Sequence, residues 1–182
     1  MMKIVTIPNP VLTTPTQRVK TITPKLRSLV EEMKKTLIAQ RDPEGVGLAA
    51  TQVGESISIF IMRPTTTGEI TVHINPEITS LPSDEVVAVS QTLKKRKNKE
   101  GKMEGCLSIP HIWAPLRRKS KVELRSMDIN GETHTEIYEG FEAIIVQHEV
   151  DHLNGILFTQ RCLEQGTQLY EEDGDELVKM KA

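Results

Sequence analysis

Two histidines and a glutamate stand together in the pattern His148-Glu149-Val150-Asp151-His152. On a helix, residues four positions apart lie on one face, so both imidazoles could bind a single metal ion. A carboxylate beside the first histidine is placed to move protons at a water molecule on that ion. The pattern therefore predicts a metal centre in which Glu149 acts as general base and acid.

The residues before this pattern predict the helix that it needs. Phe141, Ile144 and Ile145 precede His148 by seven, four and three positions, so they share its helical face. Gly155 follows as a signal for the end of the helix. The alternative, two surface histidines on an amphipathic helix, fits poorly because His148 lies on the apolar stripe.

A catalytic metal site of this type needs a third protein ligand and one open position. One metalloprotease class extends the pattern to His-Glu-x-x-His-x-x-Gly-x-x-His, but here Phe158 stands where the third histidine would be. A downstream glutamate is the second option. Glu164, Glu171 and Glu172 are available, but they lie in an acidic stretch with little sign of a supporting helix. A ligand from upstream is the better candidate.

That upstream candidate is Cys106, in the segment Glu104-Gly105-Cys106-Leu107-Ser108. A thiolate beside two imidazoles suits zinc or iron(II) rather than magnesium or calcium. Two alternatives are a buried structural cysteine and a disulfide with Cys162, the other cysteine of the chain. The disulfide is disfavoured because cysteine is scarce and no secretory signal precedes the domain.

A third segment, from Gly45 to Gln52, reads Gly-Val-Gly-Leu-Ala-Ala-Thr-Gln. Gly-x-Gly-x-x-Ala is also a dinucleotide-binding pattern, which requires a preceding strand. Residues 26–40 predict a helix instead, so that interpretation is disfavoured. The small residues are better explained by a close approach of the backbone to another group, with the Gln52 amide as a nearby donor. A plain tight turn before a strand is the alternative.

Together the three segments resemble the peptide deformylase family. That family has the blocks Gly-x-Gly-x-Ala-Ala-x-Gln, Glu-Gly-Cys-x-Ser and Gln-His-Glu-x-x-His. Here they occur in order at residues 45–52, 104–108 and 147–152, and Ile7-Pro8-Asn9-Pro10-Val11-Leu12 resembles the family's opening. The resemblance spans about residues 4 to 160.

The resemblance implies a hydrolase of protein biosynthesis that removes the N-formyl group from N-formylmethionyl nascent peptides and releases formate. Cys106, His148 and His152 would hold one divalent ion, natively Fe(II), with zinc, nickel or cobalt able to replace it. A metal-bound water would attack the formyl carbon with Glu149 as proton carrier, and the Gln52 amide and the Leu107 N–H would stabilise the formyl oxygen. The expected substrate-binding residues are Val46, Gly47, Gly105, Phe141, Ile144 and Ile145.

The chain departs from the family pattern in three places. Trp113 stands where many bacterial members carry an arginine, and residues 83–102 form a longer, more basic connection. The basic run from Lys94 to Lys102 could touch ribosomal RNA, but a solvated loop is the simpler interpretation because the run has no interleaved aromatic residues. The acidic C-terminus does not resemble the basic helix with which some members dock on ribosomes.

Length and composition predict one globular domain over residues 1–182, with a short acidic C-terminal tail from about residue 164. The resemblance implies that this is the catalytic domain. The chain has 37% hydrophobic and 26% charged residues and a net charge of −2, which gives no general attraction to DNA or to anionic membranes. No apolar run reaches the roughly 20 residues that span a bilayer. We therefore expect a cytoplasmic protein without membrane contact.

Strands before a central helix, with few strand–helix alternations, predict an α+β fold. The resemblance implies the same fold, with mainly antiparallel β-sheets around a central metal-bearing HExxH helix. Thr23 and Pro24 predict a helix start, with the helix running to about Ala39. Strands are predicted at Ile57–Met62 and Thr71–Asn75. A hairpin is predicted from Val122 to Tyr138 around Asn130-Gly131.

Two other functions are compatible with parts of the pattern. A general metallopeptidase would also use His-Glu-x-x-His, but the missing third histidine disfavours it. A binding module with a structural metal would need a fourth protein ligand, and no obvious candidate is present.

Overall fold

The computed structural model describes residues 1–41, 44–65, 68–80, 86–88, 103–174 and 176–181. The basic run from Lys94 to Lys102 lies outside these residues. In the described part of the chain, no helix is both long and apolar enough to cross a bilayer.

A five-stranded antiparallel sheet forms the larger part of the fold, with strand order β1-β2-β3-β8-β9. Its strands are β1 (Gly47–Ala49), β2 (Ile59–Met62), β3 (Thr71–Ser80), β8 (Lys121–Met127) and β9 (Thr133–Glu139). Strand β1 lies at one edge of this sheet. Part of the small-residue segment from Gly45 to Gln52 therefore lies on an edge strand.

A four-stranded antiparallel sheet has the order β11-β10-β6-β5. Its strands are β5 (Glu104–Cys106), β6 (Ile109–Ala114), β10 (Tyr170–Asp173) and β11 (Glu176–Lys179). A further pair joins β4 (Val86–Ala88) to β7 (Arg117–Lys119). Strand β5 is the second edge strand that carries motif residues.

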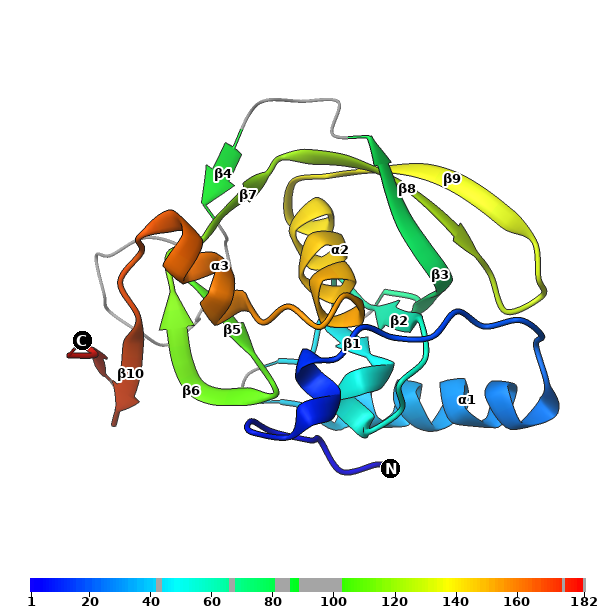
Figure 1. The fold of residues 1–182 in the computed structure, drawn as a ribbon, viewed down its shortest axis with the longest axis horizontal. Coiled ribbons are helices and arrows are strands. Elements are labelled where there is room, and N and C mark those ends of the chain that lie inside the picture. The colour runs from blue at the N-terminus through cyan, green and yellow to red at the C-terminus, as the bar shows by residue number, and fades with distance from the viewer. Residues whose placement is uncertain (42–43, 66–67, 81–85, 89–102, 175, 182) are drawn as a thin grey trace.

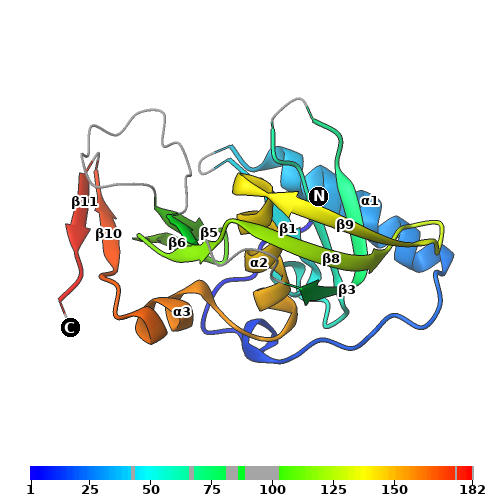
Figure 2. The ribbon, with the colours of Figure 1, turned by 90° about the horizontal axis from the view of Figure 1, so that it is seen from above.

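Helix α2 (Gly140–Leu153) lies between the two sheets, as Figure 1 and Figure 2 show from two directions. Ile145 and Val146 pack with Phe60 in a core shared with the larger sheet. Ile144 packs with Phe158 in a second core shared with the smaller sheet. Burial on both sides explains why the segment is so apolar, and the predicted α+β arrangement around a central helix is confirmed.

The other helical elements are α1 (Pro24–Ala39), α3 (Phe158–Gln165) and the 3₁₀ turns η1 (Pro10–Thr13) and η2 (Ala50–Val53). Helix α1 begins at Pro24 and ends at Ala39, which confirms both predicted bounds. At its start, the Thr23 side chain accepts a hydrogen bond from the Leu26 N–H. The expectation that Glu164 lacks a supporting helix was wrong, because it lies in α3.

The predicted strand ends were less accurate. Strand β2 begins at Ile59 rather than Ile57, and β3 continues beyond Asn75 to Ser80. Asn75 has a positive φ of 51°, and a register shift between Ile74 and Glu77 lets the strand pass this point and pair again with β8.

The acidic C-terminal segment, expected as a tail, contains the end of α3 and two strands. Tyr170 and Glu171 of β10 pair with Trp113 and Ile112 of β6. The segment is therefore part of the smaller sheet.

Candidate metal centre

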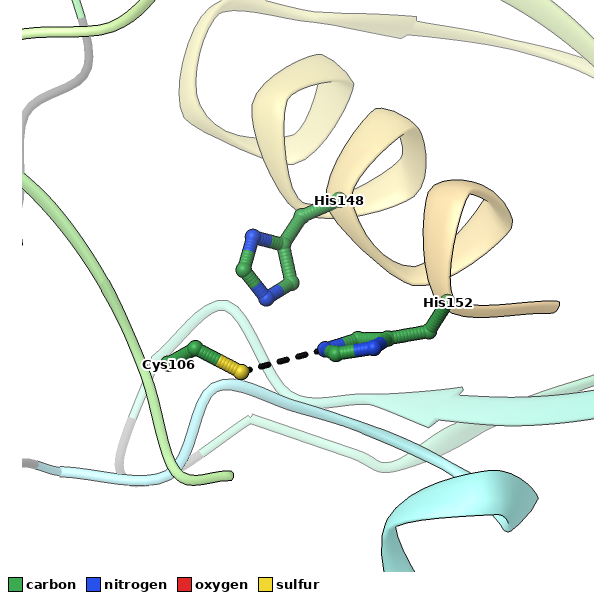
Figure 3. A group of neighbouring side chains, drawn as sticks. All are labelled: Cys106, His148 and His152. Atoms are coloured by element: carbon green, nitrogen blue, oxygen red, sulfur yellow. Dashed lines mark hydrogen bonds between the residues drawn. The ribbon is translucent and has the colours of Figure 1, made fainter. Parts of the chain in front are cut away.

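Three potential metal ligands come together between β5 and α2. One ligand atom from each of Cys106, His148 and His152 lies within 4.8 Å of the other two. The Cys106 Sγ is 3.1 Å from His152 Nε2, and the two imidazole rings are 4.9 Å apart at an angle of 77° (Figure 3). The structure thus brings together the three residues that the sequence predicted as ligands.

The local structure explains how these side chains converge. His148 and His152 are one turn apart on α2, so they project from the same face. Cys106 ends β5, where a register shift against β6 follows the regular pair Gly105–Trp113. Such an irregularity re-aims the residue beside it, and Cys106 faces the two histidines (Figure 3).

A buried network of ion pairs contacts the Nδ1 side of the His148 ring. Its Nδ1 lies 2.6 Å from Glu104 Oε1. Glu104 also accepts two 2.8 Å hydrogen bonds from Arg118, which donates a third, of 2.9 Å, to Asp151. Arg161 binds the same aspartate. A carboxylate on one ring nitrogen orients the ring and leaves the other nitrogen for a metal.

Sequence reasoning gave no role to Glu104, Arg118 or Asp151. Glu104 and Asp151 lie inside recognised motifs, but nothing local in the sequence pairs them with an arginine on β7. All three side chains are buried, and charged residues are almost never buried without a partner.

The electrostatics of the site favour a thiolate. Burial by itself would raise the pKa of Cys106, but the neighbouring His152 and His148 outweigh it and lower that pKa to about 5. Burial likewise opposes ionisation of Glu104, yet Arg118 and His148 lower its pKa to about 2. The surroundings therefore favour the thiolate form of Cys106 and the carboxylate form of Glu104.

Glu149 has the opposite environment. Burial dominates and raises the pKa of its carboxyl group to about 7. Its Oε2 atom has no hydrogen-bond partner among the described residues, although it is shielded from solvent. A buried carboxylate with an unsatisfied oxygen beside three metal-type ligands is placed to bind a water molecule.

A pocket adjoins the site, and its walls include Glu149, His148, Cys106, Gln52 and Leu107. All six predicted substrate-binding residues line it as well: Val46, Gly47, Gly105, Phe141, Ile144 and Ile145. Glu44, Gly45 and Glu104 also line it and were not predicted. His152 does not line the pocket and is 1% exposed.

The structure shows what the small residues of the motifs approach. A Cβ at Gly47 would lie 2.3 Å from Glu149 Oε1, and one at Gly105 would lie 2.7 Å from the Trp113 ring. The Gln52 side chain accepts a 2.8 Å hydrogen bond from the Ala49 N–H, and its Nε2 lies 3.5 Å from Cys106 Sγ. Its amide N–H is thereby directed at the ligand group.

The donor set fits a divalent ion of borderline or soft character. The Cys106 thiolate and the two imidazoles would supply three protein ligands to such an ion and would leave a fourth position open. A second group of possible ligands, Asp128, Glu132 and His134, lies in the β8–β9 hairpin. Glu132 and His134 are exposed, and the Asp128 carboxylate already accepts hydrogen bonds from the N–H groups of Asn130 and Glu132.

Comparisons with known proteins agree with this geometry. Residues 1–168 match the family model described as polypeptide deformylase. The peptide deformylase of Desulfotalea psychrophila is 35% identical over 176 residues, which cover 94% of each chain. That of Caulobacter vibrioides is 40% identical over 143 residues, which cover 77% of this chain and 73% of the relative.

Solved structures give the same result. A class I type b peptide deformylase from Acinetobacter baumannii has a TM-score of 0.75 and 30% identity, covering 88% of this chain and 98% of that one. The peptide deformylase of Thermotoga maritima has a TM-score of 0.73 and 33% identity, covering 88% and 97%.

Proposed function

The chain belongs to the peptide deformylase family, and from that premise we propose how its own residues carry the reaction. The protein is a metal-dependent hydrolase that removes the N-formyl group from nascent peptides. Cys106, His148 and His152 would hold its divalent metal, and Glu149 would carry the proton. The observation that supports this assignment best is the buried, unsatisfied Glu149 carboxylate beside the three ligand atoms.

The three ligands suit Fe(II) as the native ion, with zinc, nickel or cobalt able to replace it. When bound, such an ion lowers the pKa of water towards neutrality and polarises a carbonyl oxygen. Glu104 contacts His148 Nδ1 and so fixes the ring, which leaves Nε2 as the nitrogen that would bind the ion. Metal analysis of anaerobically purified protein tests the identity of the ion. Cys106→Ala should lose the metal, whereas Cys162→Ala, at the other buried cysteine, should keep it.

Glu149 takes a proton from the attacking water as the new C–O bond forms at the formyl carbon. When the C–N bond breaks, it delivers that proton to the departing amine, so that formate and a free N-terminal methionine result. Negative charge on the formyl oxygen is met by the Gln52 amide N–H and the Leu107 backbone N–H. Support comes from the positions of both residues in the pocket wall beside Cys106.

The substrate peptide lies in the pocket between β1 and β5. Each strand is at the edge of its sheet, and an edge strand can pair with an extended peptide through its backbone. Gly47 and Gly105 come from these two strands. The methionine side chain occupies the apolar part of the pocket, formed by Val46, Phe141, Ile144 and Ile145.

The proton role is tested by Glu149→Gln. The variant should keep its metal and its fold but lose about 10²–10⁴-fold in kcat, the usual contribution of a general acid–base group. Glu142→Gln, on the same helix near its N-terminus, is the matched control and should retain full turnover. Near-normal activity in a metal-replete Glu149→Gln protein would refute the assignment.

Two broader expectations stay predictions. We propose that residues 1–182 act as one catalytic domain, supported by a site that takes its residues from both sheets and from α2. A transient ribosome contact would suit a nascent substrate, and co-sedimentation with ribosomes at low and high salt would test it.

A further inference from the structure

Strand β6 is irregular opposite the metal cysteine. Gly105 pairs with Trp113, but the next residue of β5, Cys106, pairs with Ile109, so three residues of β6 are left without a partner on β5. Within these three, His111 has a positive φ of 66°. A non-glycine residue in this conformation is strained, and it persists only where its surroundings hold it.

The C-terminal hairpin supplies contacts that hold this irregular segment. Glu172 of β10 accepts a 2.6 Å hydrogen bond from Trp113 Nε1 through Oε1. Its other oxygen, Oε2, lies 3.0 Å from His111 Nδ1. One carboxylate therefore contacts both the strained residue and the residue at which regular pairing resumes.

Trp113 links this contact to β5, the strand that carries Cys106. Its side chain is 2% exposed and packs with Met103 and Tyr170. The edge of its ring lies so close to Gly105 that a Cβ there would come within 2.7 Å of it. Gly105 precedes Cys106 directly, and a cysteine side chain has a single rotatable bond before its sulfur, so the position of Sγ follows the backbone closely.

We propose that Glu172 is a positioning residue for the metal cysteine. By holding Trp113 and His111, it keeps the irregular part of β6 in the shape that directs Cys106 out of the sheet and towards the two histidines. This role rests on the function proposed above for Cys106 as a ligand. It also gives the C-terminal hairpin a task in metal binding.

The test compares the metal affinities of Glu172→Ala, Glu172→Gln and Glu171→Ala with that of the full-length parent protein. Glu171 is the matched control, because it is the neighbouring residue of β10 and is exposed. Affinity for Co²⁺ and Zn²⁺ is measured by competition with a chelator. The absorption band of the cobalt–thiolate bond reports on Cys106 itself, and the emission of Trp113, the single tryptophan of the chain, reports on its surroundings.

We expect Glu172→Ala to weaken metal binding about tenfold, at the low end of the effect of outer partners on a metal site. The cobalt–thiolate band and the tryptophan emission should change with it. Glu172→Gln should restore most of the affinity, since its amide oxygen can accept from Trp113 Nε1. Glu171→Ala should match the parent protein in all three measurements.

Equal affinity and equal spectra for Glu172→Ala and Glu171→Ala would overturn the inference. If Glu172→Ala does not fold, Trp113→Phe keeps a ring against Gly105 but removes the N–H donor. It should then show weakened binding, and parent-like binding would overturn the inference equally. Failure of the proposed function is recognised separately, because the parent protein would then show no cobalt–thiolate band and Cys106→Ala would bind metal as well as the parent.

Discussion

The carboxylate of Glu149 lies against the backbone of Gly47, so that a Cβ at this glycine would fall 2.3 Å from Oε1 and 2.8 Å from the carboxyl carbon. Gly47 belongs to β1, at the edge of the larger sheet, whereas Glu149 belongs to α2. The glycine therefore makes room for the proposed proton carrier. Its role is steric, since its φ is not in the left-handed region.

Gly47→Ala should displace the Glu149 carboxylate and lower kcat about 10²-fold, because a shift of about 1 Å in a catalytic group can have that effect. Metal content should not change, since none of the three ligands is touched. Steady-state kinetics with a formyl-Met peptide, together with metal analysis, checks this. Gly166→Ala is the control for a glycine lost away from the site: a Cβ there meets nothing within 4 Å, but the positive φ of 61° strains an alanine, so this variant should lose stability and keep its turnover. Unchanged turnover in Gly47→Ala would contradict the proposed role of Glu149.

Ile145→Ala should enlarge the methionine pocket and reduce the preference for formyl-Met over a formyl peptide with a smaller first residue by about tenfold. The variant should also lose about 2–5 kcal/mol of stability, because Ile145 is 3% exposed and part of the core. Val146→Ala separates the two effects. Val146 lies in the same core but does not line the pocket, so its variant should lose stability and keep its selectivity. Equal selectivity in the two variants would show that the side chain is recognised elsewhere.

Arg118→Ala should destabilise the protein by about 3–5 kcal/mol, since it leaves Glu104 and Asp151 buried without their shared cation. Urea unfolding of the metal-free protein measures this directly. The adjacent Arg117 is exposed, and Arg117→Ala should change stability by less than about 0.5 kcal/mol. A similar small effect of both substitutions would mean that the network does not stabilise the fold.

Acidification should weaken the fold through His73, which stacks on Phe60 and contacts the hydroxyls of Ser126 and Thr71. Burial lowers the pKa of His73 from 6.5 to about 4. Between these values the unfolded chain binds the proton and the folded one does not. The contribution of His73 to stability is therefore fully present above about pH 6.5 and is lost as the pH drops towards 4, by about 3 kcal/mol in total.

The free energy of unfolding of His73→Asn and of the parent protein, measured from pH 7 to pH 4.5, checks this contribution. The variant should lose less stability on acidification than the parent. His134→Asn, at a largely exposed histidine of β9, controls for the removal of an imidazole. If the parent and His73→Asn lose stability in parallel, His73 is not the source of the effect.

Local signals in the sequence determined several secondary-structure elements of this protein and the shared helical face of its two histidines. The Thr23-Pro24 pair marked the start of α1, and Asn130-Gly131 marked the hairpin between β8 and β9, because caps and turns are set by neighbouring residues. The spacing of His148 and His152 needed only helical periodicity to place both on one face. The family's three blocks then supplied Cys106 as the third ligand.

Tertiary structure alone decided how these residues are supported. Arg118 meets Glu104 and Asp151 across 14 and 33 residues of sequence, and Trp113 meets Glu172 across 59. No periodicity or spacing marks such pairs, because side chains that are distant in sequence become partners only when strands from separate segments pair. For the same reason, the segment that the sequence presents as an acidic tail contains β10, which pairs with β6. There the Glu172 carboxylate accepts a hydrogen bond from Trp113.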